Sequence, residues 1–521
     1  MFIKKSYNIL FNDKSFAIYL FVISLLINQY YGNKGVFPMD SFIHFDPAYR
    51  ILNGEFPIKD YWVAHGIFVD YLQSLFFLIF GVSWKSYVLH ASFFNGFLTV
   101  ATYFIFRNFK LNKYYSLIYS FFFCVLAYPS SGTPFLDHHS AFLSLLGIYC
   151  LILAIDKNKS LYWFLLPACF GFAFLSKQVP SAYVILCISL LIIFYALINR
   201  KFNCLKYVFI SSLTFIITIL AIGIYQDISL KSFLVQYIYF PQSIGSDRIN
   251  NLNLSFTGFI GNFKFIYLVL FPLFYINLKN LFSKKSYIYE KSFYVFLSLI
   301  FLTFALIFHQ ILTKNQIFIF FLIPVLAGFS HIYLKNLNLK HKPKVFMIIV
   351  LICFFATSKY HLRFNENRKF HELNNVNFEL AIGAEAIDKK LLSLNWITPF
   401  SDDPKEDLEF TKIAKEVLTK DNRKKMVLTD HLFFSAILEE KLFSPSRTYD
   451  NISYPGKKNK YFKYYKNFFL DKIKKNNIEV IYTLNLDNAD ESFLLYNFID
   501  RKCITKTIIF KEIKRFELNK C

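Results

Sequence analysis

The stretch Val179–Ile198, VPSAYVILCISLLIIFYALI, decides the fold class because it contains twenty residues and no charged side chain. About 20 apolar residues in a helix match the hydrocarbon core of a bilayer, which is roughly 30 Å thick. The whole chain of 521 residues is 55% hydrophobic and has a mean hydropathy of +0.38. A water-soluble protein of this size rarely reaches such values, because only part of its chain needs to be buried.

Ten further stretches of this kind precede residue 359. Together they predict eleven membrane spans, at residues 15–31, 84–106, 114–129, 138–155, 161–176, 179–198, 207–225, 263–278, 292–311, 316–334 and 345–358. Residues 66–82 are also apolar, but they contain Asp70 and Gln73. We therefore expect this segment to form a helix that lies along the membrane surface.

The net charge of +23 could indicate a nucleic-acid partner, but its distribution argues against one. Residues 1–358 contain 28 Lys and Arg, and most of them lie in short clusters in every second connection between the apolar stretches, as in cytoplasmic loops. These clusters are Lys4, Lys5 and Lys14; Arg107, Lys110 and Lys113; Lys157 and Lys159; Arg200, Lys201 and Lys206; Lys279, Lys284, Lys285 and Lys291; and Lys335, Lys340, Lys342 and Lys344. We expect a cytoplasmic N-terminus, an extracytoplasmic C-terminal region and no nucleic-acid partner.

Acidic residues show the opposite bias. Of the 11 Asp and Glu before residue 359, eight fall in the predicted outer connections: Asp40, Asp46, Glu55, Asp60, Asp70, Asp137, Asp227 and Asp247. The carboxylate chemistry of the membrane domain is therefore predicted on its outer face.

The apolar stretches end near residue 358, and residues 359–521 contain 30 basic and 24 acidic residues. Segments 424–430 (KKMVLTD) and 478–484 (IEVIYTL) have the composition of strands, and 461–475 and 492–500 that of helices. The sequence thus predicts an all-α polytopic membrane domain, residues 1–358, followed by a small soluble α/β domain, residues 359–521. Two cysteines of the latter, Cys503 and Cys521, are able to pair in an oxidising compartment.

The first outer loop, residues 32–83, is the most informative for function. Its first half, residues 32–66, reads GNKGVFPMDSFIHFDPAYRILNGEFPIKDYWVAHG and combines acidic with aromatic residues. Asp46 and Pro47 are residues that favour the start of a helix. We expect a short helix from there to about Asn53, and an active site in this loop.

These elements resemble the GT-C superfamily of membrane glycosyltransferases, which includes protein O-mannosyltransferases and the lipid A aminoarabinose transferase. The resemblance rests on Asp40, Tyr49, Leu52–Gly54, Leu75–Gly81, Trp84, Asp137 within TPFLDHHSAF, and Gly171–Gln178 (GFAFLSKQ). It covers about residues 15–358. The chain departs from the family at Asp40, which is followed by Ser41 where the family has an acidic pair.

The resemblance implies an inverting glycosyltransferase that takes a sugar from a polyprenyl-phosphate lipid on the extracytoplasmic face. The acceptor is a lipid, a glycan or a protein, and the location is the plasma membrane, the inner membrane of a bacterium. A carboxylate would deprotonate the acceptor hydroxyl. Asp40 is the first candidate for this base and Asp46 the second, although Asp46 alternatively only caps a helix and Asp40 only lies in a solvated loop.

A cation near the leaving phosphate would stabilise its developing charge. The predicted donor-phosphate ligands are Lys177, Arg248 and Lys314, and the residues predicted to line the cavity are Tyr49, His65, Asp137, His138, His139 and Gln178. Lys177 alternatively only extends its charge to the membrane surface, and Asp137 only caps a helix. No HExxH or DxD pattern occurs, so we favour no metal and no cofactor, with a divalent cation as the alternative.

The sequence favours a transferase over three other classes of membrane protein. A flippase or transporter for a lipid-linked sugar often contains repeats and broken helices near the midplane, and we find no repeat. An O-antigen ligase or polymerase generally places its functional loop late in the chain, whereas the informative loop here comes first. A scaffold for the soluble domain would leave the outer acidic residues unexplained.

Overall fold

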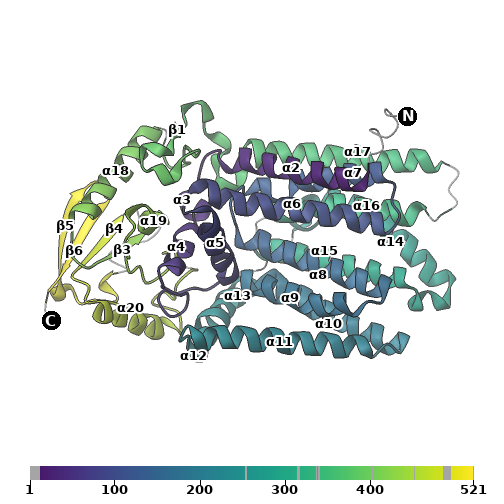
Figure 1. Cartoon of the computed structure of the whole chain (residues 1–521), viewed down its shortest axis with the longest axis horizontal. Helices are drawn as coiled ribbons and strands as arrows, with labels where there is room; N and C mark the ends of the chain where they lie inside the picture. Colours follow the sequence, from purple (N-terminus) through teal and green to yellow (C-terminus); the bar gives the residue numbers. More distant parts are fainter. Residues whose placement is uncertain are drawn as a thin grey trace. The chain divides into compact units, whose positions relative to one another are not determined.

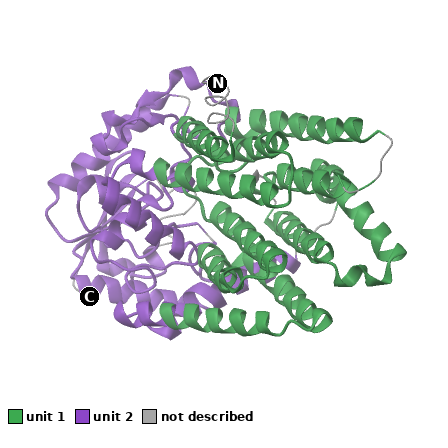
Figure 2. Cartoon of the chain, turned by 45° about the vertical axis from the view of Figure 1, so that its right-hand side comes forward, with its two compact units in different colours: residues 1–32, 88–218, 251–370 green, residues 33–87, 219–250, 371–521 purple. Residues whose placement is uncertain are grey.

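The computed structural model in Figure 1 describes residues 12–250, 252, 255–313, 317–335, 337, 341–401, 403–450, 452–484 and 495–519. The chain folds as two compact units, drawn in different colours in Figure 2. Unit 1 comprises residues 1–32, 88–218 and 251–370, and unit 2 comprises residues 33–87, 219–250 and 371–521. The first outer loop thus belongs to the same unit as the C-terminal region of the chain.

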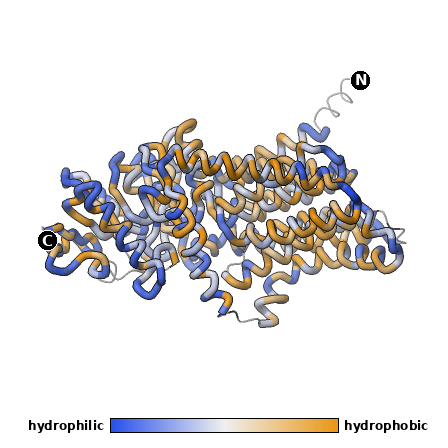
Figure 3. Tube along the Cα trace, turned by 90° about the horizontal axis from the view of Figure 1, so that it is seen from below, coloured by the Kyte–Doolittle hydropathy of each residue, from blue (hydrophilic) through white to orange (hydrophobic). Residues whose placement is uncertain are grey.

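Apolar helices form unit 1, and Figure 3 shows their hydrophobic residues along almost their whole length. They are α2 (Asp13–Gly32), α6 (Trp84–Asn108), α7 (Lys113–Leu126), α8 (Leu136–Lys157), α9 (Ser160–Ser176), α10 (Gln178–Asn199), α11 (Asn203–Tyr225), α14 (Lys264–Ser283), α15 (Lys291–Thr313), α16 (Leu322–Lys335) and α17 (Lys342–Tyr360). The first residues of α6 and the last of α11 belong to unit 2. Every predicted span coincides with one of these helices.

Eight of these helices are long and apolar enough to cross a membrane, fewer than the eleven predicted. The other three, α7, α9 and α16, contain 14, 17 and 14 residues. Helix α7 ends before the 3-10 turn Tyr128–Ser130, and α16 follows the 3-10 turn Ile317–Ile319. At α7 and α16 the apolar composition therefore extends beyond the helical backbone, so composition alone overestimates the lengths of these two helices, whereas α9 covers the whole of its predicted span. The polytopic α-helical class itself is confirmed.

Unit 2 contains the predicted small α/β region. Strands β3 (Lys425–Thr429) and β4 (Val480–Leu484) pair in parallel, and β6 (Ile513–Leu518) pairs antiparallel with both β4 and β5 (Ile504–Phe510). The sheet order is β3-β4-β6-β5, and a separate ladder joins β1 (Ile382–Gly383) to β2 (Asn395–Trp396). The helices of this unit are α3 (Pro38–Ser41), α4 (Phe45–Leu52), α5 (Ile67–Phe80), α12 (Leu230–Phe233), α13 (Phe240–Asn250), α18 (Pro404–Lys420), α19 (Phe434–Leu438) and α20 (Phe462–Asn476).

Both strands and the helix at 461–475 predicted for the C-terminal region are confirmed. The helix predicted at 492–500 lies partly outside the described residues. Cys503 is disulfide-bonded, and Cys521 lies outside the described residues.

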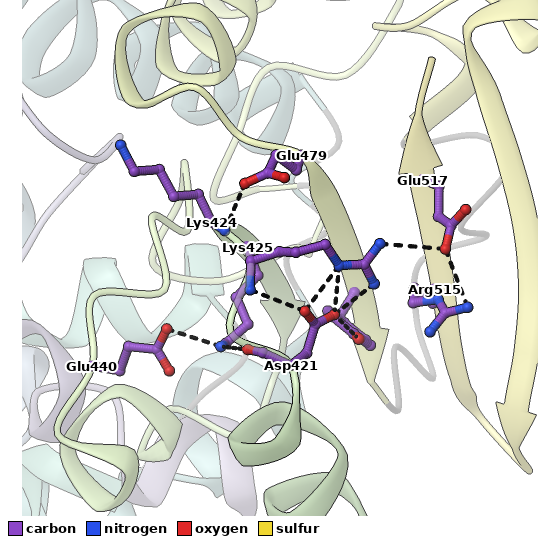
Figure 4. Close-up of polar contacts among 9 residues, drawn as sticks. Asp421, Lys424, Lys425, Glu440, Glu479, Arg515 and Glu517 are labelled. Atoms are coloured by element: carbon purple, nitrogen blue, oxygen red, sulfur yellow. Dashed lines mark hydrogen bonds and ion pairs between the residues drawn. The ribbon is translucent and has the colours of Figure 1, made fainter.

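A network of charged side chains holds the start of β3 (Figure 4). Arg423 Nη2 lies 2.7 Å from Asp421 Oδ2, and the Tyr482 hydroxyl donates to the same carboxylate over 2.6 Å. Lys425, buried in β3, pairs with Glu440 over 2.9 Å. The network joins the segment before β3 to β4, and it brings no nucleophile or open cavity with it. We therefore assign it a role in stability.

Backbone hydrogen bonds fasten the first outer loop to the C-terminal region of unit 2. The Val36 amide donates to the Ile397 carbonyl over 2.9 Å, and the Trp62 amide donates to the Pro445 carbonyl over 2.8 Å. The Trp62 ring lies 5.2 Å from the Tyr465 ring, within the apolar core that also includes β3 and β4. A segment that looked like a connection between spans is therefore an integral element of a folded body.

A buried ion network lies at the centre of this body. Asp70 of α5 accepts from His44 Nδ1 over 2.6 Å and from the guanidinium of Arg447. The side chains of all three are at most 4% exposed. Burial raises the pKa of the Asp70 carboxyl and the Arg447 charge opposes that rise, so the carboxylate depends on its partner. Removing one partner from such a pair typically costs about 3–5 kcal/mol.

Helix α5 has 14 residues, about 21 Å of helix, which is too short to span a bilayer. This agrees with the expectation that residues 66–82 do not cross the membrane. Their position along its surface stays a prediction. Asp70, the charged residue that led to this expectation, is tolerated in the apolar helix because it pairs with His44 and Arg447.

Gly66 precedes α5 at a point where no side chain fits. It has a φ of 82°, and a Cβ there would lie 2.7 Å from Arg447 Nη1 and 2.9 Å from His44 Cε1. Gly54 offers a matched comparison, because its φ is 76° and a Cβ there would meet nothing within 4 Å. The two positions share the backbone strain of a left-handed residue and differ only in crowding.

We expect Gly54→Ala to destabilise unit 2 by about 1 kcal/mol through backbone strain alone. Gly66→Ala should cost about 3 kcal/mol or more, because it adds the displacement of Arg447 and His44. Thermal unfolding of the two purified variants in the same detergent measures the difference. Equal losses in the two variants would contradict the crowding around the ion network.

Candidate active site

Asp40 lies on the short helix α3 of unit 2 and is half-buried. The residues after it are held firmly. Ser41 Oγ lies 3.2 Å from His371 Nδ1, and the Phe42 ring packs against the Trp84 and Phe433 rings at 4.7 and 4.8 Å. Since both anchors belong to the same folded unit, the backbone that carries Asp40 is fixed relative to the C-terminal region.

Asp46, the second candidate base, is buried in α4. It accepts from Ser435 Oγ over 2.8 Å and from the Ala436 amide over 3.2 Å, both in α19. Burial raises the pKa of the Asp46 carboxyl to about 6, and these hydrogen bonds and the nearby Arg50 oppose the rise. These contacts dock α4 onto α19 and occupy both carboxylate oxygens of Asp46.

The remaining predicted residues of unit 2 are spread over several elements. Tyr49 is half-buried in α4, His65 is half-buried just before α5, and Arg248 is half-buried near the end of α13. Lys314 lies outside the described residues. The predicted roles of Tyr49, His65 and Arg248 stay predictions.

In unit 1, the structure brings Asp137 and Lys177 together. Lys177 Nζ lies 2.6 Å from Asp137 Oδ1, with the two side chains 19% and 5% exposed. Helix α8 begins at Leu136 and α9 ends at Ser176, so the two residues come from the same end of the α8–α9 hairpin. The sequence had predicted both at one end of their spans, but it had not predicted the pair.

Lys177 lies at a break between two helices. Its backbone is extended, with φ −159° and ψ 132°, and separates α9 from α10. Its carbonyl accepts from Ser181 Oγ over 2.7 Å and from Ser140 Oγ over 3.2 Å. Gln178 follows as the first residue of α10 and is half-buried. The hydroxyl groups fix the break, and the break lets the lysine side chain reach α8.

His138 and His139 follow Asp137 and point to different partners, as expected for neighbours on a helix. His138 Nε2 lies 3.0 Å from Ser130 Oγ, whereas His139 Nε2 lies 3.0 Å from His90 Nε2 and its Nδ1 contacts the Tyr128 hydroxyl. Both are buried. They form a polar chain beside Asp137 within the bundle.

Three residues near Asp137 are not among those predicted from the sequence: His90, Tyr128 and Arg368. The buried Arg368 donates to the carbonyls of Pro129 over 2.8 Å and Ser131 over 2.9 Å, and so holds the 3-10 turn that precedes α8. The only signal for Arg368 was its basic neighbourhood, and nothing distinguished His90 or Tyr128 from other residues of apolar spans. Their contacts join residues far apart in sequence.

Among the described residues, no three His, Cys, Asp or Glu side chains are grouped as a metal site would require. Adjacent His138 and His139 are engaged with Ser130, His90 and Tyr128 instead.

These features define a class: a polytopic membrane protein with a lysine–aspartate pair at one end of a helical hairpin and a first outer loop folded into a C-terminal α/β unit. Residues 64–225 match the family model described as dolichyl-phosphate-mannose-protein mannosyltransferase. The matched segment includes Asp137, Lys177 and Gln178. The predicted resemblance to the GT-C membrane glycosyltransferases is confirmed there.

Two solved structures are similar to the chain. The crystal structure of ArnT from Cupriavidus metallidurans in the apo state is 12% identical over 96% of this chain and 97% of that chain, with a TM-score of 0.48. The crystal structure of the same protein bound to undecaprenyl phosphate has the same identity and coverage and a TM-score of 0.44. No curated protein matches the sequence significantly.

Proposed function

We propose that this chain is a membrane glycosyltransferase that moves a sugar from a polyprenyl-phosphate lipid to an acceptor hydroxyl on the extracytoplasmic face. The observation that carries the proposal is the Lys177–Asp137 pair, because it lies in the segment of the chain that matches the mannosyltransferase family model. The donor is of the same chemical class as the undecaprenyl phosphate in one of the two similar crystal structures.

Lys177 contacts the donor phosphate in this proposal. An ammonium group has three N–H donors, and Asp137 accepts one of them over 2.6 Å. The other two are available to phosphate oxygens, and a charge-assisted hydrogen bond to phosphate is stronger than a neutral one. As the bond from the anomeric carbon to the phosphate oxygen breaks, negative charge grows on the phosphate, and a fixed cation stabilises it.

Asp137 positions Lys177. Its side chain is only 5% exposed, so without the lysine it would be a buried, unpaired carboxylate. The pair therefore keeps the cation in place before the donor binds. Such preorganisation means that the protein does not need to rearrange when charge develops in the reaction.

Asp40 acts as the general base in this proposal. It accepts the proton of the acceptor hydroxyl while the oxygen bonds to the anomeric carbon, and the lipid phosphate leaves with the electron pair of the broken bond. Attack from the face opposite the phosphate inverts the anomeric configuration. The anchors at Ser41 and Phe42 support this role, because a base must be held within hydrogen-bond reach of its proton.

We expect Asp40→Asn to lower the rate of sugar transfer by about 10²–10⁴-fold, because general-base catalysis contributes that much. Membranes that contain the full chain would be incubated with radiolabelled polyprenyl-phosphate sugars and cell-envelope lipids. Asp247→Asn is the control, since it removes an exposed carboxylate that is also in a predicted outer connection. Unchanged transfer by Asp40→Asn would exclude Asp40 as the base. A flippase would be favoured if membranes with the wild-type protein show no transfer while the lipid-linked sugar accumulates in a deletion strain.

A second experiment separates phosphate binding by Lys177 from a purely structural ion pair. We expect Lys177→Gln to abolish transfer, and the double variant Asp137→Asn, Lys177→Gln to stay inactive although no unpaired charge is left. Lys177→Arg should retain some of the activity, with a raised KM for the donor. Recovery of wild-type transfer in the double variant would show that the pair only stabilises the bundle.

A further inference from the structure

A cavity of about 470 Å³ opens in unit 1 where the α8–α9 connection meets the α10–α11 connection. This volume is in the range of small-molecule sites. The residues that line it include the buried Trp163 and Tyr195, and also Ser160, Arg200, Lys201 and Asn203. Helix α8 has 22 residues, so the cavity is about 33 Å from the end that carries Asp137. It is separate from the Lys177–Asp137 pair.

The charge around this cavity is positive. Arg200 is exposed and Lys201 is half-buried, and none of the residues that line the cavity is acidic. Within the described residues of the chain, neither cation has a carboxylate at ion-pair distance. Lys201 Nζ lies over the ring of Tyr195, which also lines the cavity, at 5.7 Å from the ring centroid. Both cations are therefore available to an anion.

Two helices also begin at the cavity. Ser160 is the first residue of α9 and Asn203 the first of α11, and both line the cavity. Backbone amides in the first turn of a helix lack partners within the helix, and the helix dipole adds partial positive charge there. In α11 the Cys204 and Leu205 amides donate to the Lys201 and Phe202 carbonyls, so this argument applies to the start of α9. A phosphate group is the common ligand of such a position. The two cations and the start of α9 thus favour the same kind of ligand.

Apolar surface continues from the cavity along the helices. The Trp163 and Tyr195 rings are stacked, with centroids 5.8 Å apart and an interplanar angle of 27°. Leu161, Leu197 and Phe209, on α9, α10 and α11, are 58%, 58% and 69% exposed. A free phosphate would leave this surface unused, whereas the acyl chains of a lipid would cover it.

We propose that this cavity binds the phosphate-bearing headgroup of an anionic membrane lipid, with Arg200 and Lys201 as the ligands of the phosphate and the acyl chains along α9, α10 and α11. The α8–α9 and α10–α11 connections are two of those predicted to be cytoplasmic from their basic residues. Cytoplasmic leaflets are rich in anionic lipid, which makes the position and the ligand consistent. The site is independent of sugar transfer.

Native mass spectrometry of the full chain in detergent tests the proposal, with phosphatidylglycerol and phosphatidylcholine as the two probes. We expect one phosphatidylglycerol to bind more tightly than phosphatidylcholine. Arg200→Gln combined with Lys201→Gln should weaken phosphatidylglycerol binding by about 30-fold, since each cation near an anionic lipid contributes about fivefold. The control, Lys284→Gln with Lys285→Gln, removes two exposed charges from another basic connection and should bind like the wild type.

Two further measurements test whether the phosphate belongs to a lipid and whether the variants fail only because they misfold. The variant Arg200→Lys with Lys201→Arg keeps both charges and should retain most of the binding. Inorganic phosphate at millimolar concentration should not displace the lipid, and displacement would show a site for free phosphate. Equal affinity of the wild type for the two lipids, or equal weakening in the control, would overturn the proposal.

Discussion

The carboxylate of Asp70 is the feature on which the arrangement of unit 2 depends. It is fully buried and contacts His44 from the first outer loop and Arg447 from the C-terminal region of the chain. A buried charge is tolerated only when it is paired and hydrogen-bonded. The requirement to keep Asp70 paired therefore links the first outer loop, which contains His44 and Asp70, to Arg447, 377 residues further along the chain. Further contacts join the same segments, such as Lys472 with Asp60 and Arg50 with the Ser444 carbonyl.

This linkage has a consequence for the candidate base. Asp40 lies in a loop that would be mobile if it only connected two spans. Because contacts of Asp70, Asp46 and Trp62 fasten the loop to the C-terminal region, the backbone at Asp40 is held in place by the whole unit. The Lys177 ammonium is fixed in a comparable way within unit 1, by Asp137 and by the break between α9 and α10. Fixed groups of opposite charge are what acid–base and phosphate chemistry require.

Local pattern was sufficient to predict the helices of the membrane domain and the strands β3 and β4, because apolar periodicity and length are properties of single segments. Pattern also drew attention to Asp70, as a polar residue in an apolar helix, and to Asp137 and Lys177, as charges at span ends. It did not identify Arg447, since a partner 377 residues away leaves no local signal. For the same reason it did not predict that residues 33–87 and 371–521 fold together, nor that Arg368 holds the turn before α8.

The central claim is that the Asp70 network unites the first outer loop and the C-terminal region in a single cooperative body. Hydrogen–deuterium exchange of the full chain in detergent, compared between the wild type and Arg447→Leu, tests it most directly. The account predicts that amides of α4 and α5 lose protection together with those of β3 and α19, while α14 and α15 keep theirs. Faster exchange confined to residues 371–521, with α4 and α5 unchanged, would contradict it.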